Sequence, residues 1–273
     1  MPIYAAAMSL PTPGPDRTAV VTGASSGIGA EIARELSRRG HQVVLVARSA
    51  DKLESLAREL GTGARVLAAD LADRSVRAGL LDRVTGLGLV PDILINNAGL
   101  STLGPVHRAD PDAEGNMIEV DVVAVADLCT RFLPGMVERG RGALLNVAST
   151  AAFQPLPGQA AYGASKAFVL SYTQSLAGEL RGTGVSATAL CPGPVDTGFG
   201  ETAGFAKEDA ETALPSFMWV PADKVAKTAV DAMARGRLVA IPGAANRVGA
   251  VFAQVAPRSL LLPILAKQHP GLK

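Results

Sequence analysis

Cysteine, histidine and aromatic residues are scarce in this chain of 273 residues. It has two cysteines, Cys129 and Cys191, and neither belongs to a C-x-x-C pair, which argues against a disulfide framework and a cysteine-rich zinc site. The three histidines, His41, His107 and His269, are scattered, and surface or packing roles suit them better than metal ligation. We therefore expect no metal site.

The chain also lacks an excess of one charge and a long apolar run. Its net charge is +1 at pH 7, and no basic run or aromatic ladder indicates nucleic acid as a partner. No stretch approaches the ~20 uninterrupted apolar residues that a membrane-spanning helix needs. Residues 1–16 contain three prolines and no basic region before an apolar core, so we expect a flexible extension rather than a secretory signal. These observations predict a cytoplasmic protein without a transmembrane segment.

Short apolar segments alternate with segments of helical periodicity along residues 17–273. Strands are expected at 19–21, 43–46, 65–68, 93–95, 143–145, 185–190 and 238–241. Helices are expected at 30–36, 52–60, 75–84, 114–139 with a kink at Pro134, 160–180 and 225–235. This alternation predicts an α/β fold, a doubly wound parallel sheet of the Rossmann type with seven strands in a single domain. Ligands of such sheets bind outside the carboxyl ends of the strands, where the strand order reverses.

A glycine-rich turn, with the sequence TGASSGIG at residues 22–29, joins the first expected strand to the first helix. Glycines let the backbone approach a pyrophosphate, and the helix N-terminus supplies N–H donors and the positive end of its dipole. The spacing G-x-x-x-G-x-G differs from the common G-x-G-x-x-G. Taken alone, the turn is therefore compatible with dinucleotide binding or with a plain tight connection.

Tyr162 and Lys166 lie four residues apart on an expected helix and share one face. A free phenol has a pKa of about 10, which is too high for efficient acid–base work near neutral pH. A neighbouring ammonium favours the phenolate and lowers this pKa. The pair alone is more typical of an ordinary amphipathic helix, so its meaning depends on the rest of the chain.

Three further motifs follow expected strands: NNAG at residues 96–99, NVAS at 146–149 and CPGPVDT at 191–197. With the glycine turn and the Tyr162–Lys166 pair, in this order and spacing, residues 18–197 resemble the short-chain dehydrogenase/reductase family. The resemblance implies the strand order 3-2-1-4-5-6-7 and hydride transfer between a nicotinamide and a carbonyl or alcohol carbon. It also implies a homodimer or homotetramer that pairs through helices 114–139 and 160–180.

The resemblance assigns catalytic roles to individual residues. Tyr162 would pass a proton to or from the substrate oxygen. Lys166 would lower the pKa of Tyr162 and bind the nicotinamide ribose, and Ser149 would hydrogen-bond the substrate oxygen. Asp121 stands where relatives carry an Asn that supports a water chain to the lysine. Asp121 is either ionised beside Lys166 or protonated against a backbone acceptor, and its place as the fourth catalytic residue depends on which form is present.

The expected cofactor is NADP(H). Arg48 ends the second expected strand after Ala47, which stands where NAD-preferring relatives carry an acid, and its guanidinium fits a 2′-phosphate. A solvated charge at a helix cap is the alternative. Ser25 would donate a second hydrogen bond, and Asp70 would accept one from the adenine amine or cap a helix. Asn96 is expected to tie neighbouring strands together. The other expected cofactor contacts are Gly23, Ser26, Gly27, Ile28, Gly29, Leu71, Asn97, Ala98, Gly99, Pro192, Gly193, Val195 and Thr197.

Residues around 197–220 are expected to form a lid over the site. The apolar residues expected at the cleft, unless they only pack the lid on the core, are Phe153, Leu156, Phe205, Leu214, Pro215, Phe217, Met218 and Trp219. The apolar tail 246–265 would cover the cleft, pack on a partner or lie on a membrane surface. The sequence thus predicts an NADP(H)-dependent oxidoreductase for a small apolar carbonyl or alcohol substrate. The alternatives are an NAD-dependent alcohol dehydrogenase and a catalytically weak nucleotide-binding regulator.

Overall fold

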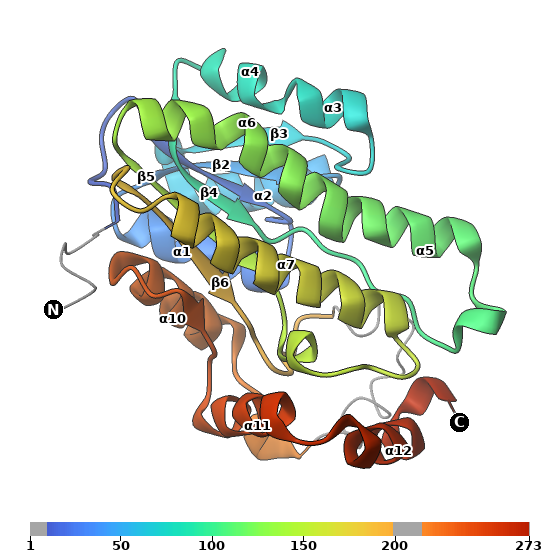
Figure 1. Ribbon diagram of the computed structural model, residues 1–273. Coiled ribbons are helices and arrows are strands. Elements are labelled where there is room, and N and C mark those ends of the chain that lie inside the picture. Colours follow the sequence, from blue (N-terminus) through green and yellow to red (C-terminus); the bar gives the residue numbers. More distant parts are fainter. Residues whose placement is uncertain (1–9, 199–214, 273) are drawn as a thin grey trace, which may run out of the picture.

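Seven parallel strands form one continuous sheet at the centre of the molecule (Figure 1). The computed structural model describes residues 10–198 and 215–272. The strands are β1 (Arg17–Thr22), β2 (Gln42–Ala47), β3 (Ala64–Ala68), β4 (Val90–Asn96), β5 (Gly142–Val147), β6 (Val185–Leu190) and β7 (Val239–Ala240). Their order is β3-β2-β1-β4-β5-β6-β7, which confirms the order that the family resemblance implied. Because every neighbouring pair is parallel, all the strands end at the same edge of the sheet.

Helices cover both faces of this sheet (Figure 1). The first layer consists of α1 (Gly27–Arg38), α2 (Ala50–Leu60) and α10 (Ala222–Ala234). The second contains α4 (Leu80–Thr85), α6 (Ala124–Glu138) and α7 (Ala160–Glu179). Successive side chains of a strand point to opposite faces, so Val20 and Leu94 are buried under the second layer and Val21 and Ile95 under the first. Strands that are apolar on both faces are typical of such parallel sheets.

One long helical segment, from Pro111 to Glu138, is interrupted near its middle. It begins as α5 (Pro111–Ile118), where the Asp110 side chain accepts a hydrogen bond from the Asp112 N–H and caps the helix. The turn Glu119–Val123 is π-helical, and α6 then continues through Pro134. The expected single helix 114–139 is therefore present with an added π-helical turn. Such turns occur often at functional sites, and this one carries Asp121.

Two elements differ from the sequence-based expectations. The segment 75–84, expected as one helix, forms α3 (Arg74–Ala78) and α4, which are separated at Gly79. Glycine is the poorest helix former after proline, so a break costs little at this position. The seventh strand was expected over 238–241 but is limited to Val239–Ala240, which pair only with β6 at the edge of the sheet.

The C-terminal tail forms two further helices, α11 (Ala244–Val255) and α12 (Arg258–Gln268). Figure 1 shows them at one end of the molecule, outside the two layers that cover the sheet. Pro257 separates them, and the Arg258 side chain donates hydrogen bonds to the carbonyls of Ala253 and Phe153. These bonds join the tail to the segment that follows β5. No helix in the described ranges is long and apolar enough to cross a membrane.

Candidate active site

A cavity of about 810 Å³ lies at the carboxyl edge of the sheet. Its walls come from the segments that follow β1, β2, β3, β4, β5 and β6, from α7 and from the C-terminal helices. Of the catalytic and cofactor-binding residues proposed from the sequence, two lie outside this lining, namely Gly29 and Asp121. The residues that line it are Gly23, Ser25, Ser26, Gly27, Ile28, Arg48, Asp70, Leu71, Asn97, Ala98, Gly99, Ser149, Tyr162, Lys166, Pro192, Gly193, Val195 and Thr197.

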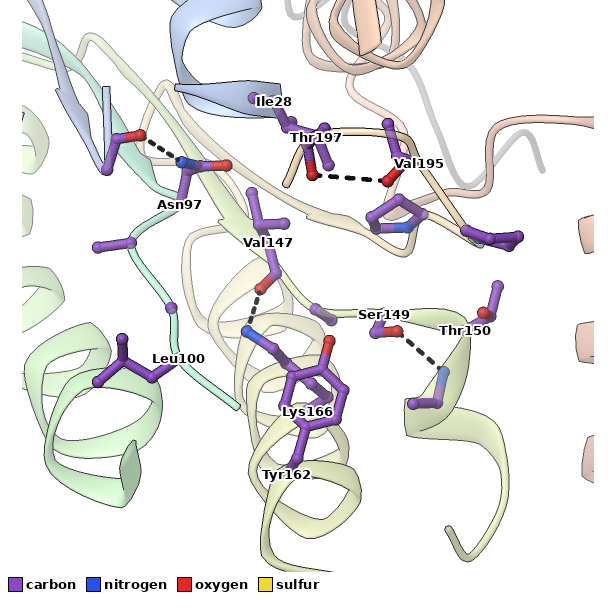
Figure 2. Close-up of a pocket in the computed structure, with 18 of the residues that line it drawn as sticks. Ile28, Asn97, Leu100, Val147, Ser149, Thr150, Tyr162, Lys166, Val195 and Thr197 are labelled. Atoms are coloured by element: carbon purple, nitrogen blue, oxygen red, sulfur yellow. Dashed lines mark hydrogen bonds between the residues drawn. The ribbon is translucent and has the colours of Figure 1, made fainter. Parts of the chain in front are cut away.

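The glycine turn is held in place by the end of β4. The Asn97 side chain donates hydrogen bonds to the carbonyls of Thr22 and Gly23 over 3.0 and 3.2 Å (Figure 2). Gly23 has a φ of 64°, and a Cβ there would lie 2.8 Å from the Ala98 Cα. A Cβ at Gly29 would overlap the Gly23 carbonyl and the Asn97 amide. Gly29 therefore serves the packing of the turn, while Gly27 and Ile28, the first residues of α1, line the cavity.

Two cations line the cavity at the carboxyl end of β2. Arg48 follows β2 and is exposed, and Lys52 on the first turn of α2 also lines this end. Lys52 was missed in the sequence analysis, although its distance of four residues from Arg48 was a usable signal. Asp70 makes a local turn, in which its side chain accepts a hydrogen bond from the Ala72 N–H. The helix-cap alternative for Asp70 is wrong, because Asp73 caps α3.

Ser149, Tyr162 and Lys166 meet at one place in the cavity (Figure 2). The Lys166 Nζ donates a hydrogen bond to the Val147 carbonyl over 3.3 Å and lies 5.5 Å from the centre of the Tyr162 ring. The Ser149 hydroxyl accepts a hydrogen bond from the Ala151 N–H over 3.1 Å. A hydrogen bond also joins the side chains of Ser149 and Tyr162. A phenol, a hydroxyl and an ammonium thus share one partly enclosed surface.

Asp121 lies behind Lys166 and is fully buried. Its Oδ2 is 2.8 Å from the Lys166 Nζ, and its Oδ1 accepts a hydrogen bond from the Leu100 N–H over 2.7 Å. Both carboxylate oxygens therefore face donors, one an ammonium and the other a backbone N–H. The alternative of a protonated Asp121 against a backbone acceptor does not fit these contacts.

The ionisation of Tyr162 reflects opposing influences. Burial raises the pKa of its phenol, the Lys166 ammonium lowers it and the Asp121 carboxylate raises it again, so that the pKa lies above the usual 10. The lowering by Lys166 that the sequence predicts is thus present, but burial and Asp121 outweigh it. Burial opposes the charge of Lys166, but Asp121 and Tyr162 outweigh it and raise the pKa of Lys166. Lys166 consequently stays an ammonium near neutral pH.

The far wall of the cavity is of mixed character. The apolar residues Leu156, Met218, Trp219, Ala253 and Leu265 line it together with the polar residues Gln154, Gln159 and His269. Phe153 is buried in the core instead, and Phe217 is 73% exposed. Phe205 and Leu214 lie outside the described residues, as does most of the expected lid. The tail therefore covers the cleft, one of the three positions expected for it.

The end of the tail is attached to the beginning of α7. His269 Nδ1 accepts a hydrogen bond from the Gly271 N–H over 3.2 Å, so its Nε2 carries the hydrogen and donates to the Gln159 Oε1 over 3.2 Å. The Gln159 amide in turn donates to the Ser101 hydroxyl over 2.7 Å. Burial lowers the pKa of His269, which favours this neutral form. No sequence motif indicated these contacts between residues so far apart in the chain.

Other polar groups near the sheet edge have structural contacts. The Asn96 amide donates to the Asn146 Oδ1 over 2.8 Å, and Asn146 donates to the Thr173 hydroxyl over 2.9 Å. Asn96 thus joins β4 to β5, as expected. Burial raises the pKa of the Cys129 and Cys191 thiols to about 12, so both are neutral. In residues 10–198 and 215–272, no three His, Cys, Asp or Glu side chains gather where they could hold a metal ion.

Comparisons with known proteins show which family the chain resembles. Residues 17–207 match the family model described as short chain dehydrogenase. An uncharacterized oxidoreductase of Staphylococcus epidermidis is 38% identical over 182 residues, which cover 67% of this chain and 79% of that protein. The very-long-chain 3-oxoacyl-CoA reductase of Anas platyrhynchos is 37% identical over 193 residues, or 66% of this chain and 60% of the reductase.

Solved structures show the same architecture. A short-chain dehydrogenase from Sphingobium yanoikuyae in complex with NADPH superposes with a TM-score of 0.77 at 33% identity, covering 90% of this chain and 95% of that one. The 3-ketoacyl-(acyl-carrier-protein) reductase from Brucella melitensis, complexed with NADH, has a TM-score of 0.75 at 29% identity. The overlap covers 84% of this chain and 96% of the reductase.

Proposed function

Because the chain belongs to the short-chain dehydrogenase family, we propose that it is an NADP(H)-dependent oxidoreductase for apolar carbonyl or alcohol substrates. The observation that carries the proposal is one cavity with two chemically different ends. Ser149, Tyr162 and Lys166 meet at the reactive end, and Arg48 and Lys52 lie at the other. Related structures with NADPH and with NADH both exist, so the choice of NADP(H) rests on the two cations.

The residues present fit a dinucleotide. The backbone at Gly23 leaves no room for a Cβ, and the N-terminus of α1 lies at the cavity, an arrangement that suits a pyrophosphate. In the described part of the chain, Arg48 and Lys52 form no ion pair with a carboxylate, which leaves both available to a 2′-phosphate. Asp70, Asn97 and Thr197 would complete the binding surface. When bound, the cofactor would supply or accept the hydride.

The chain's own residues would handle the proton and the developing charge. The Tyr162 hydroxyl would give its proton to the substrate oxygen during reduction and take it back during oxidation. The Ser149 hydroxyl would donate a hydrogen bond to the same oxygen. The Lys166 ammonium, kept charged by Asp121, would stabilise the phenolate that remains. Asp121 does not line the cavity, so it is a positioning residue rather than a group that touches substrate.

Two observations support an apolar substrate. The part of the cavity wall outside the proposed cofactor site has apolar surface, contributed by Leu156, Met218, Trp219 and Leu265. A relative with 37% identity is named for a very-long-chain acyl substrate. The polar Gln159 and His269 are already bonded to each other, which reduces their cost beside an apolar molecule.

The test is cofactor oxidation by the purified protein with NADPH and with NADH over carbonyl compounds of increasing chain length. We expect turnover with NADPH, and a fall in kcat of about 10²–10⁴-fold in Tyr162→Phe, the size of a lost acid–base contribution. NADPH affinity should stay the same in this variant. Tyr172→Phe is the matched control, because Tyr172 lies on the same helix but outside the cavity. Undiminished turnover in Tyr162→Phe, or no turnover with any carbonyl, would contradict the proposal.

A further inference from the structure

Helix α11 has a buried face and, on its opposite side, an exposed apolar face. Asn246, Ala250 and Ala253 are buried and line the cavity. The residues two positions away, at the spacing i, i+3, i+4 and i+7, form a separate face. These are Val248, Val251, Phe252 and Val255, with exposed fractions of 71, 59, 62 and 75%.

Helix α12 continues this exposed surface. Leu260, Leu262 and Ile264 are 65, 40 and 52% exposed, while Leu261 between them is buried. We call Val248, Val251, Phe252, Val255, Leu260, Leu262 and Ile264 the C-terminal apolar face. Single exposed apolar side chains are common on proteins, but seven within residues 248–264 exceed the usual scatter. A surface of this kind indicates an interaction site.

The charged residues on the two helices that carry this face all have one sign. No Asp or Glu occurs after Asp231, whereas the same stretch contains Arg235, Arg237, Arg247, Arg258, Lys267 and Lys273. Arg247, Arg258 and Lys267 are exposed on α11 and α12 themselves. Among the described residues these three side chains form no ion pair with a carboxylate. The two helices that carry the C-terminal apolar face therefore bear a net positive charge.

This combination of apolar and cationic residues favours an anionic membrane over a second copy of the chain as the partner. A second copy of the chain would bring two such faces together and place like charges opposite one another. An anionic phospholipid surface offers acyl chains to the apolar side chains and phosphates to Arg247 and Lys267. We propose that the C-terminal apolar face binds the surface of an anionic membrane.

The position of the cavity gives this binding a consequence. Ala250, Ala253 and Leu265 line the cavity from the same two helices whose other side carries the C-terminal apolar face. A helix with side chains is roughly 10 Å across, so only about one helix would separate bound lipid from the cavity. The substrate is accordingly a carbonyl or alcohol dissolved in the lipid phase, an assignment that rests on the proposed function.

The binding test is flotation of the full chain, without cofactor, with vesicles of phosphatidylcholine or of phosphatidylcholine mixed with phosphatidylserine. We expect flotation with the anionic vesicles and a loss of at least tenfold in partitioning for the combined variant Val251→Gln, Phe252→Gln and Val255→Gln. Arg247→Gln with Lys267→Gln should weaken binding to the anionic vesicles more than binding to the neutral ones. Val106→Gln is the matched control, because Val106 is 64% exposed on a different segment.

Several outcomes would overturn the membrane assignment. One is a wild-type chain that floats with neither vesicle, and another is unchanged flotation of the combined variant. A third is a dimer in light scattering that the combined variant converts to a monomer, which would make a second copy the occupant. Circular dichroism of each variant checks that the fold is retained.

The substrate assignment has its own readout. A long-chain ketone embedded in anionic vesicles and a short water-soluble ketone are compared in the wild type and the combined variant. We expect the variant to lose at least tenfold in rate with the embedded ketone and to keep its rate with the soluble one. Equal losses with both ketones would contradict delivery from lipid. Flotation without turnover on either ketone would defeat the proposed function and leave the membrane binding intact.

Discussion

At the scale of residues, Asp121 and Lys166 form a buried ion pair next to the cavity. A fully buried carboxylate lies 2.8 Å from an ammonium that is 5% exposed, and the Leu100 N–H satisfies its second oxygen. Buried charges persist only when they are paired and hydrogen-bonded, so each of the two depends on the other. The pair also sets the charge that Tyr162 experiences. The departure from the family pattern at this position is thus compatible with an intact Ser149–Tyr162–Lys166 group.

Replacing Asp121 by Asn should move the activity of alcohol oxidation to lower pH. The Asp121 carboxylate raises the pKa of Tyr162, so a neutral amide removes that contribution and the pKa falls. Oxidation needs the phenolate, and its rate rises as pH passes through this pKa. The measurement is kcat/KM for oxidation against pH, with Asp112→Asn on the exposed part of α5 as the control. A displacement to higher pH would remove Asp121 from the electrostatics of the site.

Arg48→Ala should weaken NADPH binding by about 1.5–3 kcal/mol, or about 10–150-fold, the range for a hydrogen bond to a charged group. NADH affinity should hardly change, because NADH lacks the 2′-phosphate. Lys52→Ala should have a smaller effect, since a lysine is a mobile point charge. Fluorescence titration of both cofactors measures the constants, and Arg58→Ala on the outer side of α2 serves as the control. Equal losses for the two cofactors would exclude a phosphate contact.

At the scale of elements, a buried arginine connects the loop after β3 to the π-helical turn. Arg77 on α3 is 1% exposed, and its guanidinium donates to the carbonyls of Leu71 and Ala72. It also pairs with Glu119 in the π-helical turn and with Asp127 on α6. One side chain therefore holds a cavity-lining loop against the segment that presents Asp121.

Arg77→Met should destabilise the fold by about 2–4 kcal/mol. Removing the Arg77 guanidinium leaves the carboxylates of Glu119 and Asp127 without their buried partner. The expected loss is smaller than for a fully buried ion pair, because both carboxylates are partly exposed to solvent. Urea denaturation gives the free energy of unfolding. Arg74→Met, an exposed arginine on the same helix, should stay within about 0.5 kcal/mol of the wild type. Similar values for both variants would show that the Arg77 contacts contribute little.

At the scale of the whole molecule, α6 and α7 form a second surface with exposed apolar side chains, which no other described segment covers. Val137 and Phe168 are each 38% exposed, and a second cavity of about 460 Å³ lies between the two helices beside Tyr172. Phe168 and Tyr172 stack with their ring centres 5.4 Å apart. This surface lies on α6 and α7, whereas the C-terminal apolar face lies on α11 and α12, so assembly and membrane binding would use different residues.

We predict a homodimer or homotetramer that associates through this surface. In a two-fold contact each substitution occurs twice, so Val137→Glu with Phe168→Glu would place like charges against one another and shift the protein toward monomers. Light scattering at micromolar concentration measures the mass, and Val106→Glu on another segment is the control. A wild-type monomer under these conditions would reject the prediction.

The sheet and the part of the cavity that follows the strand ends were predictable from the sequence because both depend on local patterns. Apolar segments mark the strands, and parallel strands end at one edge, so residues that directly follow them necessarily come together. Arg48, Asn97 and Ser149 are of this kind. The glycine turn also follows from local chemistry, since Gly23 needs a positive φ and a close backbone neighbour.

What the tertiary structure alone decided are contacts between distant segments and the balance of burial against charge. Gln159 meets His269, and α11 closes the cavity, through packing that no local spacing encodes. The pairing of Asp121 depends on the Leu100 N–H and the Lys166 ammonium reaching its two oxygens. The pKa of Tyr162 lies above its usual value because burial, which depends on every neighbouring segment, outweighs the nearby ammonium that the sequence did reveal.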